Sequence, residues 1–322
     1  MARVTQLAAA GALVGGLVLY PPAIVGLRRL RVLQRERPDG PTSHLSKAGT
    51  PTAGGVVFCA VLVVAWLLGL RGAAGGVVVG AGVLGMAVGL FDDLTKVRTG
   101  EGIRVVPKFL LLAACAGLLG VGLALTGAQS QLIPVAGWRD LGLFGTALAA
   151  LAVLATSNAV NLTDGVDGLA AGAAVPGFLA LGLAAQLQGR PELAGTCWAV
   201  AAVLLAFLVF NRPRAKIFMG DAGSLALGLM LAVAAAEVGL LILLPLLAAV
   251  FLVETGSVIL QVGYFRLSGG RRLFRMSPLH HHLEMGGLGE WAVDLWLWAA
   301  SWVAGGLALL WAVATGLGGR PG

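Results

Sequence analysis

The chain has 322 residues, of which 58% are hydrophobic and only 11% are charged, and its mean hydropathy is +0.91. Soluble domains carry about 25% charged residues, so this composition excludes an ordinary soluble protein and indicates lipid as the solvent for most of the surface. The net charge is +7. The basic residues flank apolar segments, which is typical of membrane proteins and argues against a nucleic-acid partner.

Apolar segments follow one another along the whole chain. A membrane-spanning helix needs about 20 apolar residues. Segment 224–265 is about twice that length, so we expect it to fold back near residues 237–239 and to supply two spans. The sequence therefore predicts an all-α, polytopic integral membrane protein with a single domain, residues 1–322. Its predicted ten spans come from segments 6–27, 53–70, 73–90, 109–126, 141–160, 169–187, 193–210, 224–265 and 291–317.

The basic residues are distributed unevenly between the two sides that alternating loops define. One side holds 17 of the 22 Lys and Arg residues, and the other side holds 5. All four histidines fall on the basic side. Because Lys and Arg concentrate in cytoplasmic loops, we expect this side to face the cytoplasm and both termini to lie outside it. The cytoplasmic loops are 27–52, 91–108, 161–168, 211–223 and 266–290 in this assignment.

Five aspartates stand at the predicted membrane–cytoplasm boundary. Asp92 and Asp93 follow the third span, Asp164 and Asp167 lie in Asn-Leu-Thr-Asp-Gly-Val-Asp-Gly-Leu, and Asp221 lies in Phe-Met-Gly-Asp-Ala-Gly-Ser. Unpaired carboxylates are costly where solvation is poor, which favours a bound cation over solvated loop acids. Carboxylates suit Mg²⁺, which binds through one or two of them together with substrate phosphates.

The four lysines of the chain, Lys47, Lys96, Lys108 and Lys216, all lie on the same side as these aspartates. Flanking charge explains the arginines that follow the first span, but Lys47 lies in a segment rich in Gly, Thr and Pro that predicts a structured loop. Carboxylates that hold a metal and lysines that hold oxyanions together indicate a phosphate or diphosphate site.

Three consecutive histidines, His280, His281 and His282, lie in the last cytoplasmic loop. Three successive residues of a helix cannot all face one ion, so a zinc site is disfavoured. We expect hydrogen bonding to an anionic or sugar substrate instead. Glu254, which falls inside a predicted span, is interpreted as marking a bend in a long helix.

The motifs together resemble the phospho-N-acetylmuramoyl-pentapeptide transferase family. The resemblance runs from about residue 35 to residue 290 and keeps the order of the motifs. The two aspartate segments resemble the wider superfamily of polyprenyl-phosphate hexosamine-1-phosphate transferases. The segments Ser-His-Leu-Ser-Lys-Ala-Gly-Thr-Pro-Thr and Pro-Leu-His-His-His-Leu-Glu are similar to the muramoyl-pentapeptide branch.

This resemblance implies an Mg²⁺-dependent reaction of UDP-N-acetylmuramoyl-pentapeptide with undecaprenyl phosphate. The products would be lipid I and UMP, in the first membrane step of peptidoglycan synthesis. The expected location is the bacterial plasma (inner) membrane, with the active site facing the cytoplasm.

The resemblance also implies roles for individual residues. Asp221 is the expected Mg²⁺ ligand, Asp92 and Asp93 are expected to be catalytic with it, and Phe218 is expected to stack on uracil. The other expected substrate-binding residues are Lys47, Lys96, Lys108, Asn158, Asn161, Asp164, Gly165, Asp167, Asn211, His280, His281 and His282.

Several alternatives stay open at this point. A sister transferase that uses UDP-N-acetylglucosamine would share the aspartates, although the histidine run argues against it. A secondary transporter would place charges near the bilayer midplane, where only Glu254 and Asp294 are candidates. The sequence does not distinguish direct attack from an aspartyl-phosphate route, nor Asp92 from Asp93 as the base. It also leaves the oligomeric state open, with a homodimer as one candidate.

Overall fold

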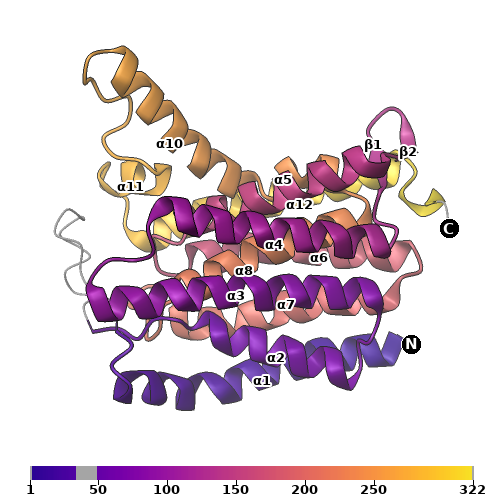
Figure 1. Ribbon diagram of the computed structural model, residues 1–322, viewed down its shortest axis with the longest axis horizontal. Helices are drawn as coiled ribbons and strands as arrows, with labels where there is room; N and C mark the ends of the chain where they lie inside the picture. The colour runs from indigo at the N-terminus through magenta and orange to yellow at the C-terminus, as the bar shows by residue number, and fades with distance from the viewer. Residues whose placement is uncertain (1, 34–48, 321–322) are drawn as a thin grey trace.

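The computed structural model describes residues 2–33 and 49–320, and almost all of its regular structure is helical (Figure 1). Within these residues, nine helices are long and apolar enough to cross a membrane. The prediction of an all-α, polytopic membrane protein is confirmed. The long helices are α1 (Ala2–Arg29), α3 (Ala73–Thr99), α4 (Val105–Leu125), α5 (Gly142–Thr163), α6 (Leu169–Leu187), α7 (Pro191–Asn211), α8 (Gly220–Val238), α10 (Ala249–Leu267) and α12 (Glu290–Ala314).

The second predicted span, 53–70, is shorter than expected. It forms α2 (Gly55–Leu68), an apolar helix of 14 residues. At 1.5 Å per residue this helix is about 21 Å long, which is less than the roughly 30 Å of a bilayer core. Tight turns at both ends shorten it, because the backbone of residues 51–55 pairs with the segment before α8 and Gly69 ends the helix.

Helix α8 lies at the centre of the bundle. Every residue of α8 from Asp221 to Val238 is buried, and helices α3, α5 and α6 pack against it. A Cβ atom at Gly89 of α3 would overlap the backbone carbonyl of Asp221. Small residues of this kind let helices approach closely in lipid. The ends of α3 and α8 that carry the aspartates are therefore in direct contact.

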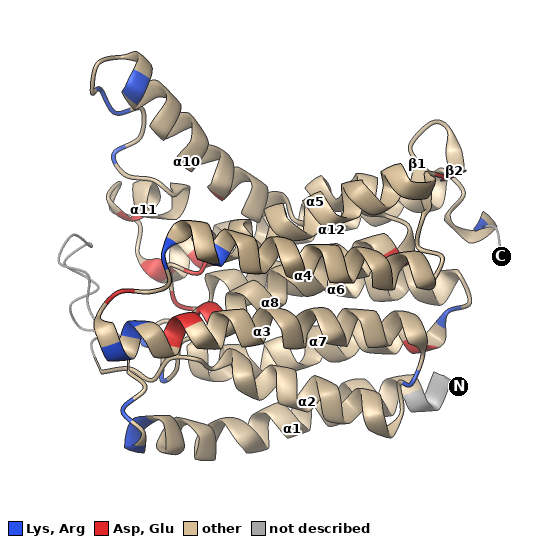
Figure 2. Cartoon of the chain, viewed as in Figure 1, with Lys and Arg blue, Asp and Glu red and all other residues tan. Residues whose placement is uncertain are grey.

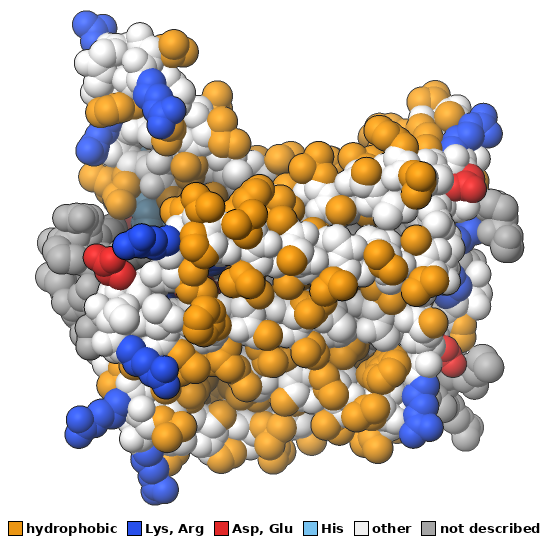
Figure 3. Space-filling view, in the orientation of Figure 1, with side chains coloured by type: hydrophobic (Ala, Val, Ile, Leu, Met, Phe, Trp, Pro, Cys, Tyr) orange, Lys and Arg blue, Asp and Glu red, His pale blue; other side chains and the backbone are white. Residues whose placement is uncertain are grey.

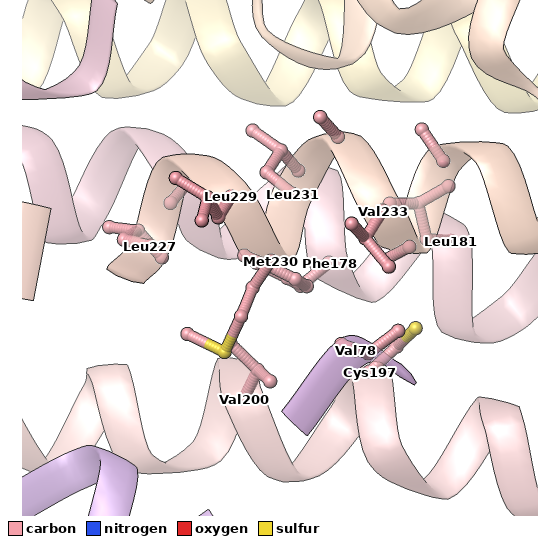
Figure 4. Close-up of a cluster of buried hydrophobic side chains, with 14 of the residues drawn as sticks. Val78, Phe178, Leu181, Cys197, Val200, Leu227, Leu229, Met230, Leu231 and Val233 are labelled. Atoms are coloured by element: carbon pink, nitrogen blue, oxygen red, sulfur yellow. The ribbon is translucent and has the colours of Figure 1, made fainter. Parts of the chain in front are cut away.

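The interior beside α8 is filled by aliphatic and aromatic side chains, as Figure 4 shows. Met230 of α8 lies near Val200 of α7, and Phe178 and Leu181 come from α6. Cys197 lies in the same cluster and is a free, buried cysteine. This close packing fixes the position of α8 along its axis relative to the neighbouring helices.

The outer surface separates apolar and charged residues. Hydrophobic side chains cover the middle of the face in Figure 3, and Lys and Arg gather toward its two ends. Figure 2 shows the same division along the helices. Leu118, Leu151, Trp302 and Leu310 are among the large side chains that are more than half exposed. A surface of this kind fits lipid contact, because soluble monomers rarely expose such wide apolar areas.

The chain folds back after α8, at the place that the sequence predicts. Gly239 ends α8 with a left-handed backbone (φ 80°), which glycine adopts without strain. A short 3₁₀ turn, η2 (Leu241–Leu243), and α9 (Leu244–Leu247) follow before α10 begins. Helix α10 then leaves the bundle at a steep angle, and the short helix α11 (Leu279–Glu284) lies beneath its free end (Figure 1).

Buried Glu237 is compensated at this turn. Its Oε1 accepts a 2.6 Å hydrogen bond from Thr126, and its Oε2 lies 3.3 Å from a guanidinium nitrogen of Arg190. Arg320, which follows the short 3₁₀ helix η3 (Leu317–Gly319), donates to the Glu237 carbonyl at 2.5 Å. Cations near a helix C-terminus are favourable, so this cluster stabilises the end of α8 that lies opposite the aspartates.

The connection between α4 and α5 contains a hairpin that the sequence analysis did not predict. Strands β1 (Ser130–Ile133) and β2 (Gly137–Asp140) pair antiparallel. The backbone N–H of Leu132 donates to the carbonyl of Gly239 at 2.8 Å. The hairpin therefore packs against the turn after α8. Its strands have four residues each, too few to give a clear alternating pattern.

Candidate active site

Most of the expected site residues lie on the ends of helices rather than in loops, which corrects the predicted boundaries. Asp92, Asp93 and Lys96 belong to the last two turns of α3, because that helix continues to Thr99 and ends only at Gly100 with φ 84°. Asn161 is near the end of α5, and Lys108 and Asp221 lie in the first turns of α4 and α8. Helix ends give these side chains fixed positions at one end of the bundle (Figure 2).

Asp93 caps helix α8 from the neighbouring helix α3. Its Oδ1 accepts the backbone N–H of Asp221 at 3.0 Å, and its Oδ2 accepts the backbone N–H of Ala222 at 3.0 Å. These N–H groups belong to the first turn of α8 and have no partner within the helix. Gly220 makes this approach available, since a Cβ atom there would lie 2.5 Å from Asp93 Oδ2. Asp93 thus determines where Asp221 lies.

Asp92, Asp221, Lys96 and Lys108 form one cluster of alternating charges. The Nζ atom of Lys96 lies 2.6 Å from Asp92 Oδ2 and 2.9 Å from Asp221 Oδ1. Lys108 pairs with Asp221 Oδ2 and lies 3.5 Å from Asp92 Oδ2. Asp92 Oδ1 also accepts the backbone N–H of Ile103 at 2.6 Å, which ties the connection between α3 and α4 to the cluster. Helices α3, α4 and α8 therefore converge here.

Asn161 joins the cluster from α5. Its Nδ2 donates to Asp221 Oδ1 at 3.2 Å and to the Ser224 hydroxyl at 2.8 Å. The amide therefore orients the Asp221 carboxylate. Asn158, one turn earlier, is exposed and donates from Nδ2 to the Leu154 carbonyl at 2.8 Å. Only Asn161 touches the charged cluster.

The donor groups fit a magnesium ion that is bound jointly with phosphates. The side chain of Asp221 is 13% exposed and that of Asp92 is 1% exposed, so Asp221 is the more accessible of the two carboxylates, and a cation bound there would replace the ammonium groups of Lys96 and Lys108. Within residues 2–33 and 49–320, no three His, Cys, Asp or Glu side chains are grouped as a metal site. Mg²⁺ is commonly held by one or two carboxylates plus substrate phosphates and water, and this arrangement matches that pattern.

Asp167 and Asn211 connect two loops at the edge of the cluster. Asp167 Oδ2 accepts the backbone N–H of Ala215 at 3.0 Å. Asn211 accepts from Gly168 N–H at 3.0 Å and donates to the Ile217 carbonyl at 2.9 Å. Both side chains are buried. They hold the loop after α5 against the loop after α7, and their expected contact with substrate stays a prediction.

Asp164 follows the last residue of α5 and is partly buried. Burial raises the pKa of its carboxyl group well above the usual value, and the nearby carboxylates of Asp221 and Asp93 raise the pKa further. Both effects disfavour the charged form. Asp164 is thus a carboxyl group that a bound cation or a hydrogen-bond donor would stabilise as the anion.

Phe218 is held by its backbone while its side chain stays partly exposed. Its N–H donates to the Pro51 carbonyl at 2.8 Å, and its carbonyl accepts from Gly54 N–H at 2.9 Å. The expected stacking of this ring on uracil stays a prediction. Lys47, the remaining lysine of the predicted site, lies outside the described residues.

The three histidines begin helix α11 and have different surroundings. His280 is buried, with its Nδ1 3.2 Å from Glu254 Oε2. His281 Nδ1 lies 2.9 Å from Glu284 Oε2, and His282 Nδ1 accepts the backbone N–H of Arg275 at 3.1 Å. A Cβ atom at Gly165 would lie 2.6 Å from His280 Nε2. The structure therefore brings His280 to the loop that carries Asp164.

Glu254 is the residue that sequence reasoning misinterpreted. A bend was expected at Glu254, whereas the structure interrupts the long segment earlier, between α8 and α10, and α10 runs unbroken from Ala249 to Leu267. The side chain is buried and contacts His280. The sequence did offer a signal for such a partner, because Glu254 is a single acidic residue in an apolar segment and ionisable residues inside a membrane usually pair with another group.

Comparisons with known proteins agree with this arrangement. Residues 76–239 match the model of glycosyl transferase family 4. A phospho-N-acetylmuramoyl-pentapeptide-transferase of Moorella thermoacetica is 45% identical over 295 residues, covering 88% of this chain and 91% of the relative. Proteins of the same name from Geobacillus kaustophilus (42% identity, 88% and 90% covered) and Heliobacterium modesticaldum (41%, 92% and 94%) are similarly close. The chain belongs to the phospho-N-acetylmuramoyl-pentapeptide-transferase family, within glycosyl transferase family 4.

Proposed function

We propose that this protein transfers phospho-N-acetylmuramoyl-pentapeptide from its UDP derivative to undecaprenyl phosphate, giving lipid I and UMP. Identity of 40–45% over about 88% of the chain to proteins of this name supports the reaction. The observation that carries the proposal is the cluster of Asp92, Lys96, Lys108 and Asp221 at one end of a membrane-embedded bundle. A lipid-linked phosphate and a water-soluble nucleotide can meet only at such a boundary.

The reaction joins two anions, so the site must neutralise charge and fix geometry. Lys96 and Lys108 supply two ammonium groups within one cluster. In the proposed complex they turn from Asp221 toward the phosphate oxygens of the substrates. Asp92 holds both lysines at its Oδ2, and Asp93 holds the first turn of α8. The aspartates thereby keep the cations where the phosphates arrive.

Mg²⁺ is part of the proposal, with Asp221 as its ligand and Asn161 orienting that carboxylate. When bound, the ion would polarise the diphosphate and stabilise the negative charge of the departing UMP.

We propose direct attack by the lipid phosphate. An oxygen of undecaprenyl phosphate bonds to the sugar-bearing phosphorus of the UDP derivative, and the bond from that phosphorus to the bridging oxygen breaks and releases UMP. The second pKa of a phosphate monoester is about 6, so little of the acceptor has a proton to lose at pH 7. An aspartyl-phosphate route is less favoured, because both oxygens of Asp93 accept backbone N–H groups and Asp92 is 1% exposed.

The remaining substrate contacts are proposed to come from residues around the same cluster. Phe218 is proposed to stack on uracil, and Asn158, Asp164, Gly165, Asp167 and Asn211 are proposed to border the nucleoside and diphosphate. Lys47 is proposed to join them, and His280, His281 and His282 would face the sugar phosphate.

The location is the bacterial plasma membrane, with the site toward the cytoplasm and both termini outside. A homodimer is the candidate assembly, which light scattering of the detergent-solubilised protein would test.

The decisive experiment is transfer by the purified protein. The wild-type chain in detergent, given undecaprenyl phosphate, Mg²⁺ and UDP-N-acetylmuramoyl-pentapeptide, should form lipid I and release UMP in equal amounts. UDP-N-acetylglucosamine should give little product. Equal or faster transfer from UDP-N-acetylglucosamine would replace the proposal with the sister reaction, and no transfer from either donor would reject both.

A further inference from the structure

Glu254 is a buried carboxylate in the second turn of α10. It is 0% exposed, whereas its neighbours Leu252 and Val253 are 55% and 52% exposed on the apolar side of the same helix. Removing a carboxylate from water costs several kcal/mol unless partners compensate. The identity of the partners therefore indicates what this residue does.

Its side-chain partner is His280, which lies 26 residues later in the sequence. The backbone N–H of His280 donates to both Glu254 Oε1 and Glu254 Oε2 at 3.2 Å. The Nδ1 atom of the same residue lies 3.2 Å from Oε2. One carboxylate thus accepts the backbone N–H at the start of α11 and lies beside the ring of its first histidine, whose Nδ1 makes no hydrogen bond within the described residues.

The other ring nitrogen of His280 points toward the proposed site. Nε2 is buried and makes no hydrogen bond to any residue in the described ranges 2–33 and 49–320. A Cβ atom at Gly165 would lie 2.6 Å from Nε2, so the absence of a side chain there lets the ring reach the loop between Asp164 and Asp167. The imidazole therefore connects α10 to that loop.

We propose that Glu254 is a positioning residue of the transfer reaction, which acts by holding His280 with Nε2 directed at the 164–167 loop. An imidazole has two distinct nitrogens, and a carboxylate at Nδ1 favours the form that carries its proton there. Nε2 then carries the lone pair and can accept a hydrogen bond from a hydroxyl group of the substrate. This inference rests on the proposed function, because it assigns Glu254 to the same site.

In a purely structural role, Glu254 would dock α10 on α11 without affecting the transfer reaction. A double-mutant cycle distinguishes this structural role from the positioning role. Glu254→Gln keeps the size of the side chain but removes one acceptor and the charge. We expect turnover to fall roughly 10–100-fold, by analogy with the loss that follows mutation of residues that orient metal-binding histidines. In the His280→Ala background the same change should cost less than about 2-fold, because residues that act as a unit are not additive.

Glu237→Gln is the matched control, since Glu237 is also buried but lies at the opposite end of α8. Its effect on turnover per folded protein should be small and equal in both backgrounds. The positioning role is overturned if Glu254→Gln costs the same factor with and without His280, or if it leaves turnover unchanged.

Hydrogen–deuterium exchange of the full chain in detergent tests the contact without relying on activity. Residues 279–284 should lose protection in Glu254→Gln and keep it in Glu237→Gln. Unchanged exchange in Glu254→Gln would overturn the contact itself. If wild type makes no lipid I while this exchange result holds, the proposed function has failed and the Glu254–His280 contact has not.

Discussion

The carboxylate of Asp93 caps the helix that presents Asp221, by accepting the backbone N–H groups of Asp221 and Ala222 at 3.0 Å each. Two residues 128 positions apart are thus held together by a hydrogen bond from a main-chain N–H to a side-chain carboxylate. The consecutive aspartates consequently differ in role. Asp92 holds the two lysines, and Asp93 holds the helix on which the proposed metal ligand stands.

Replacing Asp93 should affect stability as well as turnover. Asp93→Asn removes one of the two acceptors, and loss of a helix cap costs about 0.5–2 kcal/mol. We expect a lower melting temperature together with a large loss of lipid I formation. Asp140→Asn is the control, because the exposed Asp140 accepts the backbone N–H of Gly142, the first residue of α5, at 2.8 Å at the opposite end of the bundle. Asp140→Asn should leave turnover intact, and an Asp93→Asn variant with wild-type melting would contradict the capping role.

Asp221→Asn should abolish transfer while the protein remains folded. The substitution keeps the shape of the side chain but removes the charge that pairs with Lys96 and Lys108. Lipid I formation by this variant should stay at background over a titration of Mg²⁺, and wild-type activity should disappear in excess EDTA. Turnover in excess chelator, or full turnover by Asp221→Asn, would show that the metal assignment is wrong.

Phe218→Ala should weaken nucleotide binding without unfolding the protein. Loss of a base–aromatic stack costs about 1–3 kcal/mol, which isothermal titration with UMP would measure as a higher Kd. Phe91→Ala is the comparison, since Phe91 is 59% exposed and belongs to the same end of α3 as the aspartates. Equal UMP affinity in wild type and a folded Phe218→Ala variant would reject stacking.

Asp164 should destabilise the metal-free protein at neutral pH. Burial raises its pKa in the folded state above the ordinary value of 3.8, so the folded state binds more protons than the unfolded state once the pH exceeds 3.8. Stability relative to Asp164→Asn therefore falls as the pH rises from 3.8 toward the raised pKa. Melting curves in EDTA should show Asp164→Asn as the more stable protein at pH 7, with the difference vanishing near pH 3.5. A variant less stable than wild type at pH 7 would contradict this.

The orientation in the membrane can be tested by cysteine labelling. Met285, close to the histidines, is 51% exposed, and Val135, in the turn of the hairpin, is fully exposed. The three native cysteines are buried, which keeps background labelling low. A maleimide that cannot cross the membrane should label Val135→Cys but not Met285→Cys in intact cells. The reverse pattern would overturn the cytoplasmic assignment of the site.

Hydropathy and motif order were sufficient for the fold class and the family. Each apolar segment has a helix in the structure, and segment 224–265 reverses at Gly239 as its length required. Lipid explains this success, since a chain in hydrocarbon must satisfy its backbone within each helix. The family resemblance implied a common site for Asp221, Asn161, Lys96 and Lys108, and the structure brings these four residues into contact.

Side-chain partners could not be read from one sequence, because each depends on contacts between distant segments. Composition alone did not show that α3 would continue past its aspartates to Gly100, which places Asp93 against the start of α8. It did not separate Asp167 and Asn211, whose side chains bond to the backbone, from Asp221, whose carboxylate pairs with Lys96 and Lys108.

By itself, the sequence determined the bundle, its charged end and its family, since apolar length, charge and local motifs are properties of single segments. The tertiary structure alone decided how the two adjacent aspartates divide their roles and why α10 carries a buried Glu254. The physical reason is the same in both cases: a carboxylate in a poorly solvated interior must find donors, and those donors come from whichever helix packs beside it. For Asp93 that helix is α8, and for Glu254 it is α11.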